Sequence, residues 1–268
     1  MSKKIGFIGC GNMAKAIIKG IINSGIFQGE NIIASDINID KLEETKKELG
    51  IKTTNNNVFV ASNSDYIVLS IKPNMYNKII SQIKNEIKNN SIIITIAAGV
   101  TLEKTENNFD KDIKLVRVMP NTPALVGEGM SALCPNSKMN EEELNEVKNI
   151  FNSFGKSEIV EEKYMNAVTA LTGSSPAIVY TFIEALADGA VLNGISRDIA
   201  YKMASQAVLG SAKMVLETRK HPGELKDAVC SPGGTTIEAM YSLEKNGFRG
   251  TIIESINKCV EKADKMSK

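Results

Sequence analysis

The sequence predicts an α/β Rossmann-type N-terminal domain followed by an all-α dimerisation domain. Short apolar strands alternate with helices over the first part of the chain, and a glycine-rich turn follows the first strand. From Lys163 onward the strand pattern stops, and helices rich in alanine and other apolar residues take over. We therefore expect a dinucleotide-binding domain at residues 1–162 and a helical dimerisation and substrate domain at residues 163–268.

Bulk composition argues against several classes of protein. The 268-residue chain carries 32 basic and 31 acidic side chains, so its net charge is close to +1 and gives no electrostatic footprint for nucleic acid. The sequence shows no unbroken apolar run of the roughly 18 residues that would suggest a membrane span. Met1 leads straight into a strand-like segment, without the pattern of a signal peptide. We expect a cytoplasmic protein with no nucleic-acid partner and no membrane partner.

Cysteine and histidine usage narrows the chemistry. The four cysteines form no C-x-x-C pair, and their spacing fits neither a zinc site nor a disulfide framework. The single histidine, His221, has no second histidine to share a metal with, and it is the only base available for a Ser–His or Cys–His pair. We therefore expect no metal site, and chemistry that depends on a cofactor or on a hydroxyl group.

The glycine-rich turn is the first motif that indicates a cofactor. Residues 4–8 form a short apolar strand, a G-x-G-x-x-A pattern follows, and a helix comes next. Gly9 permits the tight turn, Gly11 lets the backbone approach a pyrophosphate, and Ala14 is small enough for contact between helix and strand. A turn shaped only by packing is the alternative. The candidate cofactor-binding residues of this motif are Gly9, Gly11, Asn12, Met13 and Ala14.

The second strand, residues 31–35, ends beside an acidic residue, Asp36. An acidic residue about 20 positions past the glycine motif usually binds the adenosine ribose hydroxyls and disfavours a 2′-phosphate, which favours NADH. Asp36 also begins a loop that could serve only as the start of the next helix, and Ser35 could bind a phosphate. Both NADPH and NADH therefore stay open as the cofactor.

Alternation of strands and helices continues to about residue 162. The near-continuous apolar strands are typical of a parallel sheet that is buried on both faces. Asn140, with Glu143 three positions on, predicts a well-capped helix start. We expect strands at 66–71, 91–96, 113–119, 130–134 and 157–160, and helices at 41–49, 56–62, 74–87, after Thr101, and at 140–153.

Small, polar or proline residues follow several of these strands. Ligands of open α/β sheets bind outside the carboxyl ends of the strands, so these loops are expected to line the cofactor site. The run at 120–123 (Pro-Asn-Thr-Pro) belongs to the same set. Glycine and proline are also common in such loops for geometric reasons alone. The candidate cofactor-binding residues here are Ser70, Lys72, Pro73, Ala97, Ala98 and Gly99.

The second half of the chain is predicted to form helices whose apolar surfaces must be buried. Ser175-Pro176 predicts a helix start, with a capping side chain and a proline in the first helical position. The helix over 177–193 is apolar or small almost all round, and Ser196 is expected to cap the next helix over about 197–218. A domain of about 105 residues has little material to bury such helices by itself. We expect a homodimer or higher homo-oligomer, with a compact monomeric bundle as the alternative.

The stretch from Ser231 to Thr236 is the candidate ligand seat of the second half. Ser231 followed by Pro232 predicts another helix start, and the two glycines that follow leave backbone N–H groups uncovered. A helix start with bare N–H groups and flanking hydroxyls suits an anion such as a carboxylate. A glycine-rich helix start shaped only by packing is the alternative.

Over essentially its whole length the chain resembles the pyrroline-5-carboxylate reductase family. The final run, through Ser231-Pro232-Gly233-Gly234-Thr235-Thr236, is close to the family's signature. Ser175 departs from the family pattern, which usually has glycine there, and we expect only a local change. The matching runs are residues 7–14, 70–73, 97–99, 117–123, 172–174, 176–177, 185–189, 225–227 and 229–236.

The resemblance implies a fold, a reaction and roles for particular residues. It implies interlocked subunits and reduction of 1-pyrroline-5-carboxylate to L-proline by NADPH or NADH, in which the cofactor performs the hydride transfer. Thr236 would hydrogen-bond the ring nitrogen, and Asn57 would lie near the adenosine ribose. The substrate carboxylate would be held by Ser231, Gly233, Gly234 and Thr235. The nicotinamide end would lie near Lys72, Pro73, Ala97 and Ala98.

Two other functions are weighed against this one. A hydroxyacid dehydrogenase of the 6-phosphogluconate type would need a catalytic lysine on a helix of the second domain, and neither Lys163 nor Lys202 sits in such a motif. A regulatory protein that senses NAD(P) would have no use for a carboxylate seat at 231–236. Oxidation of NAD(P)H on addition of pyrroline-5-carboxylate separates the three.

Overall fold

The computed structural model describes residues 2–267, which form two compact units. The first unit runs to Ser174 and also takes in the end of the chain from Cys259. The second unit is Ser175–Lys258. The boundary between the two compact units therefore lies a little later than the predicted domain boundary after residue 162. That predicted boundary stays a prediction.

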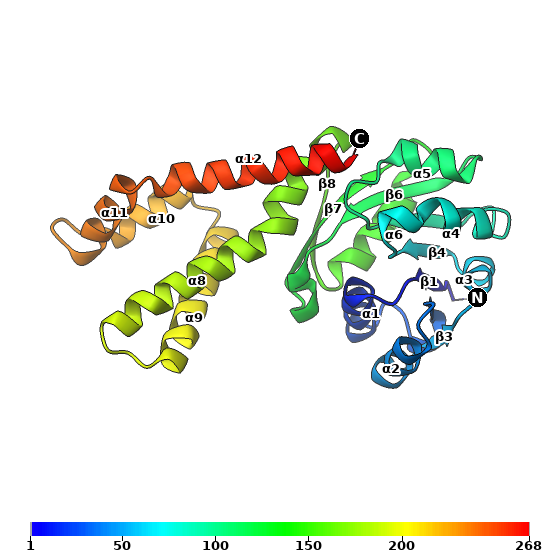
Figure 1. The fold of residues 1–268 in the computed structure, drawn as a ribbon, viewed down its shortest axis with the longest axis horizontal. Helices are drawn as coiled ribbons and strands as arrows, with labels where there is room; N and C mark the ends of the chain where they lie inside the picture. The colour runs from blue at the N-terminus through cyan, green and yellow to red at the C-terminus, as the bar shows by residue number, and fades with distance from the viewer. Residues whose placement is uncertain (1, 268) are drawn as a thin grey trace. The chain divides into compact units, whose positions relative to one another are not determined.

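The first unit is built on one eight-stranded sheet, in the order β3-β2-β1-β4-β5-β6-β7-β8 (Figure 1). All neighbouring strands are parallel except β6 and β7, which are antiparallel. The strand order reverses direction between β1 and β4, which places the topological switch point beside the glycine-rich turn. The strands are β1 (Ile5–Ile8), β2 (Ile32–Ser35), β3 (Lys52–Thr54), β4 (Tyr66–Leu69), β5 (Ile92–Thr95), β6 (Lys114–Met119), β7 (Gly129–Pro135) and β8 (Gly155–Ile159).

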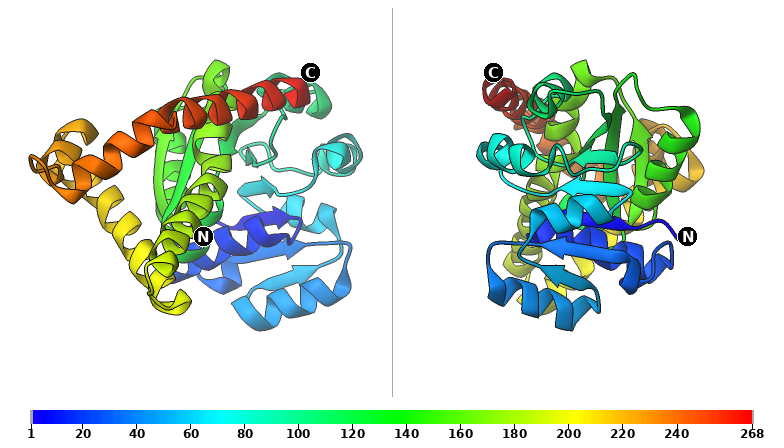
Figure 2. Two further views of the ribbon diagram at one scale, coloured as in Figure 1. Left: turned by 60° about the vertical axis from the view of Figure 1, so that its left-hand side comes forward. Right: turned by 90° about the vertical axis from the view of Figure 1, so that its right-hand side faces the viewer.

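Helices cover both faces of this sheet, as the views in Figure 2 show. Apolar side chains of α1 (Asn12–Ser24), α2 (Ile39–Leu49) and α6 (Glu141–Asn152) join one core cluster. Those of α3 (Asn57–Asn63), α4 (Tyr76–Ile83) and α5 (Leu102–Phe109) join a second cluster on the other face. Short 3₁₀ turns connect the elements: η1 (Gly29–Asn31), η2 (Pro73–Met75), η3 (Thr122–Val126) and η4 (Glu162–Tyr164).

The strand sequences explain why both faces need a helical layer. In β4, Tyr66 and Val68 join the first cluster, whereas Ile67 and Leu69 join the second. Successive side chains of a strand point to opposite faces, so a continuous apolar run buries on both sides. Each buried aliphatic side chain contributes about 1.5–3 kcal/mol of transfer free energy. The predicted doubly covered sheet is confirmed, and the three-residue edge strand β3 is an addition to it.

Two predicted helix starts are confirmed. Asn140 accepts a hydrogen bond from the N–H of Glu143, whose side chain bonds back to the N–H of Asn140. Thr101 caps α5 by accepting from the N–H of Lys104 at 3.1 Å. The predicted helix over 74–87 is shorter: η2 comes first and α4 ends at Ile83.

The predicted helix start at Ser175-Pro176 is wrong. The chain is already helical there, through α7 (Met165–Val168) and a π-helical turn, η5 (Thr169–Ser174), which leads directly into α8 (Ser175–Leu192). Proline removes one helical N–H and collides with the carbonyl four residues earlier. The wider π-helical turn accommodates this proline inside a continuous helix.

One helical stretch among residues 2–267, Glu162–Leu192, is long and apolar enough to cross a membrane by length and composition alone. Its most apolar window has a mean hydropathy of 1.3, and few of that window's residues are buried. This stretch is not an unbroken apolar run, because threonine, serine and glycine interrupt it. A helix that packs against another protein chain has the same length and composition.

The second unit leaves much apolar surface open. Its helices are α8, α9 (Arg197–Thr218), α10 (Pro222–Val229), α11 (Thr235–Lys245) and the greater part of α12 (Phe248–Ser267). Helices α8 and α9 pack against each other. Large apolar side chains nevertheless remain exposed, among them Val179, Tyr180, Phe182 and Leu186 on α8 and Ile199, Met203, Leu209 and Met214 on α9. This surface is what the predicted burial between subunits requires.

The end of α12 is anchored in the first unit. Asp264 accepts a hydrogen bond from the side-chain amide of Asn166 at 2.8 Å, and Ser267 donates to the amide oxygen of the same residue at 3.3 Å. The helix therefore continues to Ser267.

Candidate cofactor and substrate sites

The glycine-rich turn has the geometry that a pyrophosphate needs. Gly9 has φ = +103°, and a Cβ there would lie 2.5 Å from the carbonyl oxygen of Ser70, so only glycine fits. Gly11 caps α1 with its backbone alone, and a side chain at Gly11 would project into open space. The first N–H groups of α1 therefore face a position where an anion can approach closely. Asn12, Met13 and Ala14 form the first turn of that helix.

Ser70 holds this turn in place from the neighbouring strand. Its hydroxyl donates to the carbonyl oxygen of Gly9 at 2.7 Å and to that of Ile8 at 3.1 Å. Its backbone N–H also donates to Ile8. The structure thus brings two of the predicted cofactor residues, Gly9 and Ser70, into direct contact.

Asp36 lies against the same turn. One carboxylate oxygen accepts from the N–H of Cys10 at 2.9 Å, and the other accepts from the N–H of Asn38 at 3.0 Å. Burial, and secondly the Asp36 carboxylate, raise the pKa of the Cys10 thiol to about 11. Cys10 is therefore protonated at neutral pH, which excludes it as a nucleophile. Asp36 is half-buried, at the end of β2 where the adenosine ribose binds in this class of fold.

Ser35 and Asn57 form a pair beside Asp36. The Ser35 hydroxyl donates to the amide oxygen of Asn57 at 2.8 Å, and the Asn57 amide donates to Gln82 at 3.2 Å. Ser35 is fully buried, so its hydroxyl would have to change partners to reach a phosphate. Asn57 is only partly buried. The roles predicted for both residues stay predictions.

A cavity of about 310 Å³ lies at the carboxyl ends of β4, β5 and β6. It contains three of the predicted cofactor residues, namely Met13, Ser70 and Ala98. Lys72 and Pro73 are exposed at the start of η2, and Gly99 (φ = +76°) packs against the backbone of Met266. The cavity residues absent from the predicted set are Ile71, Ile96, Met119, Pro120, Asn121, Thr122 and Gly173. The Pro-Asn-Thr-Pro run signalled three of them, whereas Gly173 comes from a distant helix.

The stretch at 231–236 differs in detail from its prediction. Helix α11 begins at Thr235 with Gly234 as its N-cap, so Ser231 is not the capping residue. Instead, Ser231 to Gly234 form a turn, in which Gly234 donates to the Ser231 carbonyl at 3.0 Å and Gly233 has φ = +66°. Proline followed by a glycine with positive φ is the pattern of a type II turn, and this preference outweighed helix initiation.

This turn keeps the geometry that was predicted for an anion-binding site, and binding of an anion there stays a prediction. A Cβ on Gly234 would overlap the Ser231 hydroxyl, so that hydroxyl lies directly over the start of α11. Gly234 caps α11 with its backbone alone, which leaves the first N–H groups of the helix to a ligand. Thr235 is exposed and Thr236 is half-buried. The hydroxyls and N–H groups predicted to hold a carboxylate therefore share one helix start.

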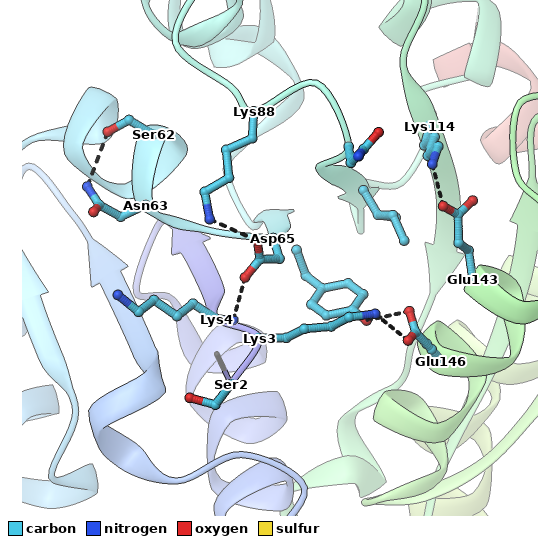
Figure 3. Close-up of a pocket in the computed structure, with 13 residues that line it drawn as sticks. Ser2, Lys3, Lys4, Ser62, Asn63, Asp65, Lys88, Lys114, Glu143 and Glu146 are labelled. Atoms are coloured by element: carbon cyan, nitrogen blue, oxygen red, sulfur yellow. Dashed lines mark hydrogen bonds and ion pairs between the residues drawn. The ribbon is translucent and has the colours of Figure 1, made fainter.

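A larger cavity, of about 440 Å³, lies at the opposite ends of the strands, where they begin (Figure 3). Three of the four lysines that line it form ion pairs with its three carboxylates. The ion pairs are Lys3–Glu146, Lys88–Asp65 and Lys114–Glu143. Within the described part of the chain, no group of three or more histidine, cysteine or carboxylate side chains could hold a metal ion.

An open, mainly parallel sheet with a glycine turn at its switch point defines a Rossmann-fold oxidoreductase that binds a dinucleotide. Two family models match the chain: NADP oxidoreductase coenzyme F420-dependent over residues 4–99, and pyrroline-5-carboxylate reductase dimerisation over residues 162–266. The pyrroline-5-carboxylate reductase of Escherichia coli is 48% identical over 268 residues, which are the whole of both chains. The chain belongs to the pyrroline-5-carboxylate reductase family.

Solved structures agree with this assignment. The pyrroline-5-carboxylate reductase of Coxiella burnetii is 33% identical and superimposes with a TM-score of 0.94 over 100% of both chains. The Plasmodium falciparum pyrroline carboxylate reductase, solved with NADP bound, is 36% identical, with a TM-score of 0.89 over 99% of this chain and 98% of that one.

Proposed function

We propose that this protein reduces 1-pyrroline-5-carboxylate to L-proline with NADPH or NADH, the last step of proline synthesis. The observation that supports the proposal most is that one chain contains two helix N-termini suited to binding an anion. One is the bare start of α1 behind Gly9 and Gly11, and the other is the bare start of α11 behind Ser231 and Gly234. Family membership and the NADP-bound relative support it.

The residues of this chain fit a dinucleotide cofactor, and each group of them would hold one part of it. Gly9, Gly11 and the N-terminus of α1 would hold the pyrophosphate, and Asp36 and Asn57 would lie along the adenosine ribose. The cavity beside Met13, Ser70 and Ala98 would receive the nicotinamide, which supplies the hydride when bound.

The substrate seat would orient the imine. Ser231, Gly233, Gly234 and Thr235 would bind the carboxylate through hydroxyl and N–H donors, and the Thr236 hydroxyl would hydrogen-bond the ring nitrogen. A protonated imine is already electrophilic, so no strong side-chain acid is required. Most of the rate enhancement then comes from holding the imine carbon in line for hydride transfer. The seats lie in different compact units, and a partner subunit could supply one of them.

The direct test follows absorbance at 340 nm as pyrroline-5-carboxylate is added to protein and NADPH or NADH. We expect oxidation of the cofactor with one L-proline formed per cofactor consumed. Binding of NADPH or NADH without turnover would contradict the proposal and favour a sensor. Turnover of a hydroxyacid in place of the imine would favour a dehydrogenase of the 6-phosphogluconate type.

Cofactor preference depends on Asp36. A carboxylate at this position repels a 2′-phosphate, so Asp36→Ser should raise the ratio of kcat/KM for NADPH to that for NADH, by roughly tenfold for the loss of one charge contact of about 1.4 kcal/mol. An unchanged ratio would mean that Asp36 serves only to accept hydrogen bonds from the N–H groups of Cys10 and Asn38.

Assembly and location complete the proposal. The exposed apolar helices and the matched dimerisation model support a homodimer or higher homo-oligomer. The protein is proposed to act in the cytoplasm on a small-molecule substrate, without a nucleic-acid or membrane partner.

A further inference from the structure

Asn121 connects two segments that both line the cavity proposed for the nicotinamide. It precedes η3 in the loop after β6, and its side chain is 8% exposed. Its amide nitrogen donates to the carbonyl oxygen of Thr172 at 3.0 Å, and its amide oxygen accepts from the N–H of Met130 at 2.9 Å. Both partners are backbone groups of fixed polarity, so the orientation of the amide is determined.

The carbonyl that Asn121 binds lacks its ordinary α-helical donor. In a regular helix the carbonyl of Thr172 would accept from the N–H four residues later, but that residue is Pro176, which has no N–H. The chain passes this point as the π-helical turn η5, and such turns are frequent at functional sites. Asn121 replaces the missing donor.

The same turn forms a wall of the cavity. Gly173 follows Thr172 and lines the cavity together with Met119 and Asn121. A Cβ on Gly173 would lie 2.8 Å from the terminal methyl carbon of Met119, so the Met119 side chain would have to shift to make room for it. The position of this wall therefore depends on the bond between Asn121 and Thr172.

We propose that Asn121 is a positioning residue, which sets the width of the nicotinamide end of the cofactor cavity through the Thr172 carbonyl. This inference rests on the proposed function, because it assigns the cavity to the nicotinamide. In this proposal, Pro176 removes a hydrogen-bond donor from the helix and Asn121 in the loop supplies another. Asn121 acts through Gly173 and the π-helical turn and makes no chemical step of its own.

Asn121→Asp tests the proposal. The carboxylate keeps an acceptor for the Met130 N–H but places an oxygen against the Thr172 carbonyl, which breaks the second bond. We expect the dissociation constant of NADPH or NADH, measured by fluorescence titration, to rise about tenfold. Binding of ADP-ribose and 2′-phospho-ADP-ribose, which lack the nicotinamide, should change by less than about twofold.

Asn136→Asp is the matched control. Asn136 is 9% exposed, and its amide likewise joins two backbone groups, accepting from Leu115 at 3.1 Å and donating to Ile113 at 2.9 Å. It lies beside the first residues of β6, whereas Asn121 follows the last residue of that strand. This variant should lose stability without any loss that is specific to the nicotinamide.

Two further variants keep the proposal testable if Asn121→Asp folds poorly. Gly173→Ala narrows the same wall without disturbing a buried amide, and should show the same selective loss of cofactor affinity. Adding Pro176→Ala to Asn121→Asp supplies an N–H for the Thr172 carbonyl and should recover part of the affinity.

Equal losses for cofactor and ADP-ribose in both Asn121→Asp and Gly173→Ala would show a merely structural role and overturn the proposal, as would wild-type affinities. These measurements use binding alone, so they stand whether or not the wild-type protein reduces pyrroline-5-carboxylate.

Discussion

The two compact units of this protein differ in how far they bury their apolar side chains. In the first unit, strands such as β4 and β5 are buried on both faces under helices of the same unit. In the second unit, α8 and α9 bury few side chains and expose many large apolar ones. The first unit completes its own core, whereas the second unit needs a further surface to cover it.

This difference indicates a division of labour. A self-contained core can hold a tight glycine turn rigidly, which suits a cofactor whose reacting atom must be placed accurately. A helical unit with exposed apolar surface is stabilised by association, so we expect the proposed substrate site at the start of α11 to depend on assembly. Variants in one unit should therefore change different properties from variants in the other.

The largest expected effect is on assembly. Leu186 on α8 is 41% exposed in the single chain, and Leu186→Glu would place a carboxylate in the expected subunit contact. Burying an unpaired charge costs several kcal/mol, so the dissociation constant of the oligomer should rise at least roughly 100-fold. Sedimentation velocity at micromolar protein would measure this. Ile37→Glu, at an apolar side chain of the first unit that is 87% exposed, is the control and should leave assembly intact.

The next effect is on the cofactor. Gly9→Ala places a Cβ 2.5 Å from the Ser70 carbonyl at a positive φ, so we expect cofactor affinity to fall by roughly 10- to 100-fold, with assembly unchanged. Gly50→Ala provides the comparison, because Gly50 has φ = +64° but open space around it. That variant should cost only about 1 kcal/mol of backbone strain. Similar affinities in both variants would contradict a special role for the glycine turn.

Thr236→Ala should affect turnover alone. Loss of the hydroxyl at the ring nitrogen is expected to lower kcat/KM by roughly tenfold or more, equivalent to about 1.4 kcal/mol. Cofactor binding and assembly should stay at wild-type values, and Thr236→Ser should retain most of the activity. Wild-type kinetics in the alanine variant would remove Thr236 from the reaction.

The smallest effect concerns the pH dependence of stability in the first unit. Burial raises the pKa of the Asp65 carboxyl, but hydrogen bonds from Lys88 at 2.8 Å and from the Lys4 N–H at 2.7 Å outweigh it, so the pKa lies below its ordinary value. A carboxyl whose pKa falls on folding stabilises the protein above its unfolded pKa, and this contribution is lost as the pH falls through the folded pKa.

Asp65→Asn should therefore be less stable than the wild type at pH 7, and the difference should vanish as the pH falls below about 4. Because the side chain is 35% exposed, solvent screening limits the difference to about 0.5 kcal/mol. Urea unfolding at several pH values would measure it. Asp112→Asn, at a more exposed ion pair, should show a smaller change, and an equal change would mean that the Lys4 contact adds nothing.

Local patterns in the sequence were sufficient for much of the fold. The strand, turn and helix around Gly9, the capping box at Asn140 and the apolar strands all depend on residues within a few positions of one another. Hydrophobic periodicity and cap chemistry act over that range, so they can be recognised without coordinates. The signature at 231–236 was likewise visible, although its turn moved the helix start from Ser231 to Thr235.

The tertiary structure alone decided the rest. The bond from Asn121 to the Thr172 carbonyl spans 51 residues of chain, and no local pattern shows that Pro176 lies inside a helix whose missing donor is supplied from a strand end. The contact between Gly99 and Met266 joins residues that are still farther apart in the sequence. Hydrogen bonds and steric contacts act over a few ångströms of space regardless of chain separation. The sequence by itself therefore determined which elements and motifs this protein has, and folding determined which of them meet.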